Sequence, residues 1–320
     1  MITRDDVLAA ERRISNYIRR TPLFRGGSSS APLWLKCEFL QHTGVFKARG
    51  AFNRQLAALE RGELDPAVGV VAASGGNAGL ANAYAAAALG VPATVFVPDT
   101  APRVKVERLL KYNATVRQIG TEYIDAYEAA QEYVAQSGAL FCHAYDQPEI
   151  AAGAGTIAEE ILQDEPGIDT IVVAVGGGGL YAGLAASAAG RTKIVAAEPF
   201  TIPTLHAALK AGRPVDVAVS GIAADSLGAR RVGDIAFSIA SKEPPISVLV
   251  KDDDIIAARA QLWSEYRIPA EYGAAAAFAA LTSGAYRPQE DERVAIIICG
   301  ANTDPGTLSD AAPEYRAAAS

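Results

Sequence analysis

Apolar, strand-like segments alternate along this chain with helix-like segments, and many of the helix-like segments are rich in alanine. The clearest strand candidates are 68–72, 93–97, 115–119, 170–175, 193–197 and 294–298, and the helix candidates include 48–60, 102–113, 123–137, 150–163 and 252–265. An alternation of strands and helices is typical of parallel sheets wrapped by helices. We therefore expect an α/β fold made of mostly parallel, twisted sheets flanked by helices.

Two of the junctions between a strand and a helix are glycine-rich loops. One has the sequence Ser74-Gly75-Gly76-Asn77-Ala78, and the other is the run Gly176-Gly177-Gly178-Gly179-Leu180. Free backbone N–H groups at the start of a helix form an anion site, and glycine lets the backbone approach a ligand closely. The four-glycine run suits a phosphate group. The hydroxyl and amide of the other loop suit a carboxylate or a phenolic oxygen.

Two side chains lie at positions that suit a role in catalysis or ligand binding. Lys47 follows Phe46 at the start of the helix candidate 48–60, where the positive potential of a helix N-terminus disfavours a protonated amine. A neutral amine can form a Schiff base with an aldehyde. Cys299 follows the strand candidate 294–298, at the edge of an open α/β sheet where ligands bind. Taken alone, however, Lys47 would be read as a surface charge and Cys299 as a core residue.

The ordered set of Phe46-Lys47, the asparagine loop 74–77, the glycine run 176–179 and Cys299 resembles the fold-type II pyridoxal-phosphate (PLP) enzymes. The resemblance extends from Thr21 to Asn302 and is strongest to the serine/threonine dehydratase and serine racemase group. It implies a two-domain fold like that of the tryptophan synthase β chain. Residues 1–52 and 146–320 would form a large PLP-binding domain, and residues 53–145 a small domain that carries the asparagine loop. We also expect a homodimer.

The same resemblance implies a role for each site residue. Lys47 would be the Schiff-base lysine, Phe46 would pack on one face of the cofactor ring, and Asn77 would contact its phenolic oxygen. Residues Gly176, Gly177, Gly178, Gly179 and Leu180 would cradle the phosphate, and Cys299 would face the pyridine nitrogen. The substrate would bind at Ser74, Gly75, Asn77 and Ala78.

Gly75 and Cys299 indicate the type of reaction. A cysteine opposite the ring nitrogen makes the cofactor a weaker electron sink than a carboxylate would, which favours loss of a β-hydroxyl over slow reprotonation. The racemases carry a serine acid/base where this chain has Gly75, which cannot exchange a proton. We therefore predict conversion of L-threonine or L-serine to 2-oxobutyrate or pyruvate, with release of ammonia.

The motifs leave several alternatives open. A serine racemase, a β-replacement synthase and a dehydratase of 3-hydroxyaspartate or phenylserine would use the same motifs. The alternative from another class is a nucleotide-binding regulatory protein. The glycine run lacks the G-x-G-x-x-G register of that class, although Glu198 lies at about the ribose-binding distance of 20 residues.

The sequence around Glu198 also suggests a cation site. The divalent-metal pattern of the racemases begins at a glutamate like Glu198, but the acid expected six residues later is Thr204 in this chain. We therefore expect at most a monovalent cation, held by Glu198 and nearby backbone carbonyls.

The composition of the chain limits the binding partners and the cellular compartment that we expect. The net charge is -7 and no long basic run occurs, so we expect no nucleic-acid partner. No window reaches the roughly 18 apolar residues of a membrane span, and the N-terminus has the Thr3/Asp6 spacing of a helix capping box rather than a signal sequence. Three cysteines without metal or redox spacing suit a reducing cytoplasm. We expect Cys37 and Cys142 to be buried, and His42, His143 and His206 to be surface or packing residues.

Overall fold

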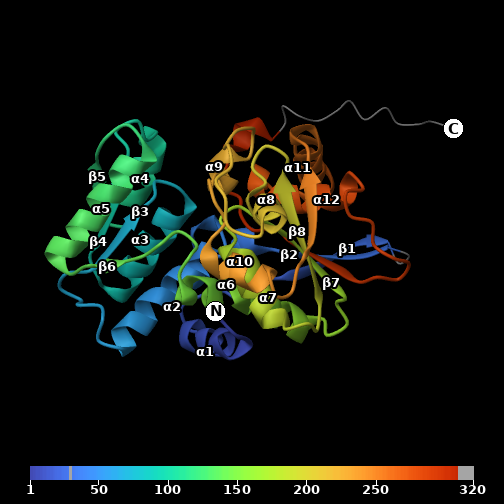
Figure 1. Cartoon of the computed structure of the whole chain (residues 1–320), viewed down its shortest axis with the longest axis horizontal. Helices are drawn as coiled ribbons and strands as arrows, with labels where there is room; N and C mark the ends of the chain where they lie inside the picture. Colours follow the sequence, from blue (N-terminus) through green and yellow to red (C-terminus); the bar gives the residue numbers. More distant parts are fainter. Residues whose placement is uncertain (29–30, 309–320) are drawn as a thin grey trace.

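The computed structural model describes residues 1–28 and 31–308, which fold around two β-sheets that lie apart from each other (Figure 1). The larger sheet has six strands in the order β1-β2-β10-β7-β8-β9, and the smaller sheet has four in the order β5-β4-β3-β6. Every pairing is parallel except that of β1 with β2. The predicted α/β class is therefore confirmed.

All six predicted strands are present, with ends that differ from the prediction by no more than two residues. The strands are β1 (Leu23–Ser28), β2 (Ala31–Lys36), β3 (Val70–Ala73), β4 (Ala93–Val97), β5 (Thr115–Gln118), β6 (Leu140–Phe141), β7 (Thr170–Ala174), β8 (Lys193–Pro199), β9 (Ile246–Val250) and β10 (Val294–Ile297). The sequence did not indicate β1, β2, β6 and β9. Three of these are edge strands, and β1 contains two glycines and an arginine, so none shows the uniform burial of β3 or β7.

Helices cover the sheets, and two of them begin directly after the asparagine loop and the glycine run. The α-helices are α1 (Arg4–Ile14), α2 (Lys47–Glu60), α3 (Asn77–Leu89), α4 (Arg103–Leu110), α5 (Tyr123–Ser137), α6 (Pro148–Asp164), α7 (Gly179–Ala188), α8 (Thr204–Ala211), α9 (Ala224–Leu227), α10 (Asp234–Ala240), α11 (Asp252–Tyr266) and α12 (Tyr272–Thr282), and the 3-10 turns are η1 (Glu38–Leu40), η2 (His42–Gly44) and η3 (Pro305–Thr307). The expected capping box at Thr3 and Asp6 is confirmed at the start of α1. Within the described residues, no helix has the length and apolar character that a membrane crossing requires.

Helix α6 packs against both α2 and α7 with almost no space between the backbones. A Cβ atom on Gly153 would lie 2.6 Å from the carbonyl oxygen of Arg49 in α2. A Cβ atom on Gly183 of α7 would lie 2.1 Å from the carbonyl oxygen of Ala151 in α6. Separations this short exclude any side chain, so glycine is required at both contacts. Lys47 and the glycine run lie at the N-terminal ends of α2 and α7, so α6 fixes both relative to each other.

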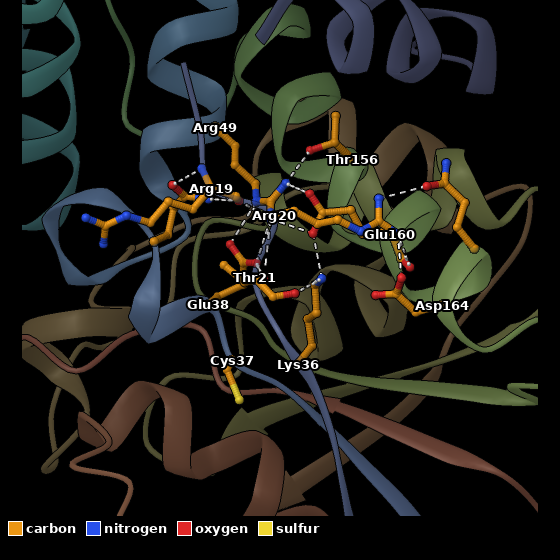
Figure 2. A network of polar contacts seen from close by, with 12 residues as sticks. Arg19, Arg20, Thr21, Lys36, Cys37, Glu38, Arg49, Thr156, Glu160 and Asp164 are labelled. Carbon is orange, nitrogen blue, oxygen red and sulfur yellow. Dashed lines mark hydrogen bonds and ion pairs between the residues drawn. The ribbon is translucent and has the colours of Figure 1, made fainter. Parts of the chain in front are cut away.

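A fully buried ion network anchors α2 (Figure 2). The Arg49 guanidinium donates to both carboxylate oxygens of Glu38, from Nε at 2.8 Å and from Nη2 at 2.8 Å. It also donates to both oxygens of Glu160 in α6, from Nη1 at 2.7 Å and from Nη2 at 2.9 Å. Lys36 of β2 donates to Glu160 at 2.5 Å and to the Thr21 carbonyl oxygen at 2.7 Å. Two cations and two carboxylates thus neutralise each other in the protein interior.

Replacing Arg49 with methionine should strongly destabilise the protein. Methionine fills the space but leaves Glu38 and Glu160 buried with one cation between them, which costs about 3–5 kcal/mol in comparable cases. Urea unfolding should show this as a lower midpoint. The control is Arg103→Met, because the Arg103–Glu107 pair is exposed and such pairs contribute about 1 kcal/mol or less. Equal losses in the two variants would contradict the role assigned to the network.

Candidate active site

Lys47 is the first residue of α2, and Phe46 is the helix N-cap. The Lys47 Nζ atom donates to the carbonyl oxygen of Ala144 at 3.1 Å and lies 5.0 Å from the centre of the Phe46 ring. Burial lowers the pKa of Lys47, so the neutral amine expected from the sequence has desolvation as its main cause. Phe46 is joined to Cys299, because its backbone N–H donates to the Cys299 carbonyl oxygen at 3.0 Å. The structure therefore brings Phe46, Lys47 and Cys299 together.

The glycine run forms the turn between β7 and α7, as expected. Gly178 is the N-cap of α7, and its φ of 87° is a left-handed conformation that glycine adopts without strain. No acceptor within residues 1–28 and 31–308 takes a hydrogen bond from the backbone N–H groups of residues 176–180. Unsatisfied N–H groups at a helix start bind anions, so this turn fits a phosphate group.

Tyr145 covers the glycine run and was not indicated by the sequence. A Cβ atom on Gly177 would lie 2.4 Å from the Tyr145 ring, and one on Gly179 would lie 2.4 Å from its carbonyl oxygen. The Tyr145 backbone N–H donates to Nδ1 of His143 at 3.2 Å. His143 also accepts a 2.8 Å hydrogen bond from the backbone N–H of Asp146, so it stabilises this turn as a packing residue. The glycine run therefore makes room for a tyrosine as well as for a ligand.

The asparagine loop precedes α3, with Asn77 as the first helical residue. The Asn77 Nδ2 group donates to the two oxygens of Glu271 at 3.1 and 3.0 Å, and its Oδ1 atom accepts from Asn302 Nδ2 at 2.7 Å. The Ser74 hydroxyl accepts from the Gly76 backbone N–H at 3.3 Å, so it shapes the loop rather than capping the helix. These contacts join the asparagine loop to the segment that follows β10.

Glu271 is a buried carboxylate in this group, and the sequence did not indicate it. It is the N-cap of α12, and its backbone N–H donates to the Gly300 carbonyl oxygen at 3.1 Å. Burial raises the pKa of Glu271 to about 7. Burial, followed by the charge of Glu271, also raises the pKa of the Cys299 thiol. An acid just before an alanine-rich helix reads as an ordinary capping residue, so no local pattern could have assigned it to the site.

A cavity separates Lys47 from the start of α7. It has an empty volume of about 340 Å³, and its lining includes Phe46, Lys47, Ala78, Tyr145 and Leu180. Residues of α2, α3 and α7 therefore meet around one space. Cys299 reaches this region through its hydrogen bond to the neighbouring Phe46, and Glu271 through its hydrogen bonds to Asn77, and the charges of both oppose the lowering of the Lys47 pKa. The site combines an amine of lowered pKa, a thiol of raised pKa and a free anion-binding turn.

Glu198 lies near the start of α8. Its carboxylate accepts from the backbone N–H groups of Leu205 at 2.7 Å and His206 at 2.8 Å, and lies 3.1 Å from the Thr204 hydroxyl oxygen. Thr204 also donates to the Gly176 carbonyl oxygen at 2.5 Å, which joins Glu198 to the glycine run. No cluster of three or more metal-binding side chains occurs among the described residues. A monovalent cation at Glu198 stays a prediction.

A lysine of lowered pKa, a glycine turn with free N–H groups and a thiol of raised pKa at the edges of parallel sheets are the features of α/β enzymes that act through a bound aldehyde cofactor. The family described as "Pyridoxal-phosphate dependent enzyme" matches residues 14–300. The chain belongs to this family. Its members use pyridoxal phosphate, and the free N–H groups of the glycine run fit the phosphate of that cofactor.

Individual relatives cover nearly the whole chain. An L-threonine ammonia-lyase from Thermotoga maritima is 34% identical over 95% of this chain and 76% of its own length. A beta-hydroxyaspartate dehydratase from Paracoccus denitrificans is 30% identical over 94% of this chain and 96% of its own length. The crystal structure of serine racemase from Dictyostelium discoideum superimposes with a TM-score of 0.87 at 32% identity, covering 95% of this chain and 99% of that one. One of these relatives is named for the predicted activity, and the other two are named for the dehydratase and racemase alternatives.

The raised pKa of Glu271 predicts a measurable pH dependence of stability. The pKa of this group is about 7 in the folded protein and 4.5 in its unperturbed state, so the folded state binds the proton more tightly. This contribution to stability is fully present below pH 4.5 and is lost as the pH rises through 7. In Glu271→Gln the contribution is absent. The unfolding free energy of cofactor-free wild type, minus that of the variant, should therefore fall by about 2–3 kcal/mol between about pH 5 and pH 8 in urea titrations. Parallel curves would exclude the raised pKa.

Proposed function

We propose that this protein is a PLP-dependent ammonia-lyase that dehydrates and deaminates a 3-hydroxy amino acid such as L-threonine or L-serine. The observation that carries the proposal is the combination of Lys47 with Cys299 rather than with a carboxylate at the end of β10. The L-threonine ammonia-lyase relative supports the same activity. The small-molecule substrate is an amino acid, as is consistent with the family.

PLP, when bound, supplies an electron sink that weakens the bonds to the α-carbon of an amino acid. Several reactions become possible once these bonds are weakened, and the residues of this chain determine which of them occurs. The N–H groups of residues 176–180 would hold the phosphate, and Asn77 would contact the phenolic oxygen. The Lys47 amine, whose neutral form is favoured by burial, would take the proton from the α-carbon. The Cys299 thiol keeps its own proton, since burial raises its pKa, and so gives the ring nitrogen no negative charge to pair with.

Gly75 favours elimination over racemisation. Racemisation needs a second proton donor on the face of the substrate opposite Lys47, and glycine has no side chain to supply one. A Cβ atom on Gly75 would have Val97 Cγ1 as its nearest neighbour, at 3.2 Å. That is tight but involves the end of a side chain, so a small residue could be accommodated there. The domain division near residues 53 and 145 and the homodimer are further parts of the proposal, both taken from the family resemblance.

The role of Lys47 is tested by chemical trapping. Borohydride reduction followed by peptide mass spectrometry should find the pyridoxyl group on Lys47, because this amine has its pKa lowered and faces the cavity. Lys47→Ala should lose the visible absorbance of the bound cofactor and nearly all turnover. Lys242→Ala serves as the control, because Lys242 is exposed and does not line this cavity. A pyridoxyl group on Lys36 or Lys105 would overturn the assignment.

The choice of reaction is tested by product analysis and by the variant Gly75→Ser. Wild type should convert L-serine or L-threonine to equal amounts of keto acid and ammonia, with only a trace of the D-amino acid. Gly75→Ser should raise the ratio of racemisation to elimination, because a hydroxyl then lies on the second face. Gly75→Ala controls for the added bulk and should not raise it. Interconversion of L- and D-serine by wild type as fast as keto-acid formation would refute the lyase proposal.

A further inference from the structure

A second cavity opens beside the asparagine loop and has an empty volume of about 360 Å³. It is lined by Gly75, Gly76 and Asn77 of the loop, by Lys105 and Arg108 of α4, and by Asp225 of α9. Helix α4 belongs to the part of the chain around the smaller sheet, and α9 to the part around the larger sheet (Figure 1). This cavity therefore lies between the two parts, where a substrate held by the asparagine loop would extend.

The lining of this second cavity carries an excess of positive charge. Lys105 forms an ion pair with Asp225. Arg108 is half-buried, and no carboxylate within residues 1–28 and 31–308 forms an ion pair with it. A partly desolvated guanidinium that lacks an acidic partner is a strong site for a carboxylate, because its N–H groups match the two oxygens. The cavity thus has one anion-binding group available in the side chain of Arg108.

The asparagine loop provides a separate anion site in the same cavity. The backbone N–H groups of Gly75 and Asn77, two residues that line this cavity, donate to no acceptor among the described residues. These free N–H groups can bind the α-carboxylate that every amino acid carries. Serine and threonine have no second anion, so their binding would leave Arg108 without a partner.

We propose that Arg108 binds a second carboxylate on the β-carbon of the substrate, so that the preferred substrate is a 3-hydroxy dicarboxylic amino acid such as 3-hydroxyaspartate. This inference rests on the proposed function and narrows its substrate class. The Cα–H and Cβ–O bonds break, water leaves, and hydrolysis of the resulting imine takes up one water. The balanced products are oxaloacetate and ammonia.

The test compares kcat/KM for 3-hydroxyaspartate and L-serine in variants of the holoenzyme. Wild type should prefer 3-hydroxyaspartate, and Arg108→Gln should lower the ratio of the two kcat/KM values by about 10- to 100-fold, as expected for one charge-assisted contact. Arg108→Lys should restore part of the ratio. Arg103→Gln, on the same helix but paired with Glu107 at the surface, should leave it unchanged. A wild-type preference for L-serine, or an equal loss for both substrates in Arg108→Gln, would overturn the inference and leave the lyase proposal intact.

A binding measurement separates this inference from the proposed function. Calorimetric titration of the holoenzyme should show that succinate binds more tightly than butyrate, and that Arg108→Gln removes the difference. Equal binding of succinate and butyrate to wild type would contradict the anion site. If no 3-hydroxy amino acid is converted at all, the proposed function fails, and this titration still decides whether Arg108 binds a second carboxylate.

Discussion

The contact between Arg49 and two buried carboxylates is the constraint on which the site depends. A guanidinium with no exposure to water needs every N–H group satisfied, and Glu38, Glu160 and Thr156 take its hydrogen bonds. Because these partners come from η1 and α6, the network sets the rotation and height of α2. Lys47 lies two residues before Arg49, in the first turn of that helix. A displacement of Arg49 would therefore move the amine whose position the chemistry requires.

Helix α6 extends the same constraint to the glycine turn before α7. It meets α2 through Gly153 and α7 through Gly183, at separations that leave no space for a side chain. Helix α6 therefore fixes the position of the Lys47 amine relative to the N–H groups of the glycine run. The separation of the two does not depend on surface loops. A rigid arrangement of this kind reduces the reorganisation that a reaction must otherwise undergo. Gly153 and Gly183 are needed because the helices pack too closely for a side chain, and not because their backbone conformation requires glycine.

The parts of the fold that could be predicted from sequence are those with a local cause. Uniformly apolar strands such as β4 and the glycine turn before α7 have signatures within a few residues, and both were expected where they occur. Strand β1 could not be recognised, because only its pairing with β2 makes Gly26 and Gly27 part of a sheet.

Glu271 and Tyr145 were missed because they reach the site through contacts between segments that are far apart in the chain. Glu271 meets Asn77, 194 residues away. The segment of Tyr145 meets the site through Ala144, whose carbonyl oxygen accepts from Lys47, 97 residues away. Neither residue has a local pattern that differs from an ordinary cap or turn residue, so only the tertiary fold assigns them to the site.

The ionisable groups around the amine share one electrostatic feature, which is that burial favours the neutral form of each. Desolvation lowers the pKa of Lys47 and raises those of Glu271 and Cys299. Negative charge then enters the site mainly with its ligands. Apart from Arg108 in the second cavity, the protein offers that charge backbone dipoles at helix starts. Such dipoles are fixed by the fold and keep their strength across the working pH range. The thiol at the end of β10 fits the same pattern, because its raised pKa keeps a buried position free of negative charge.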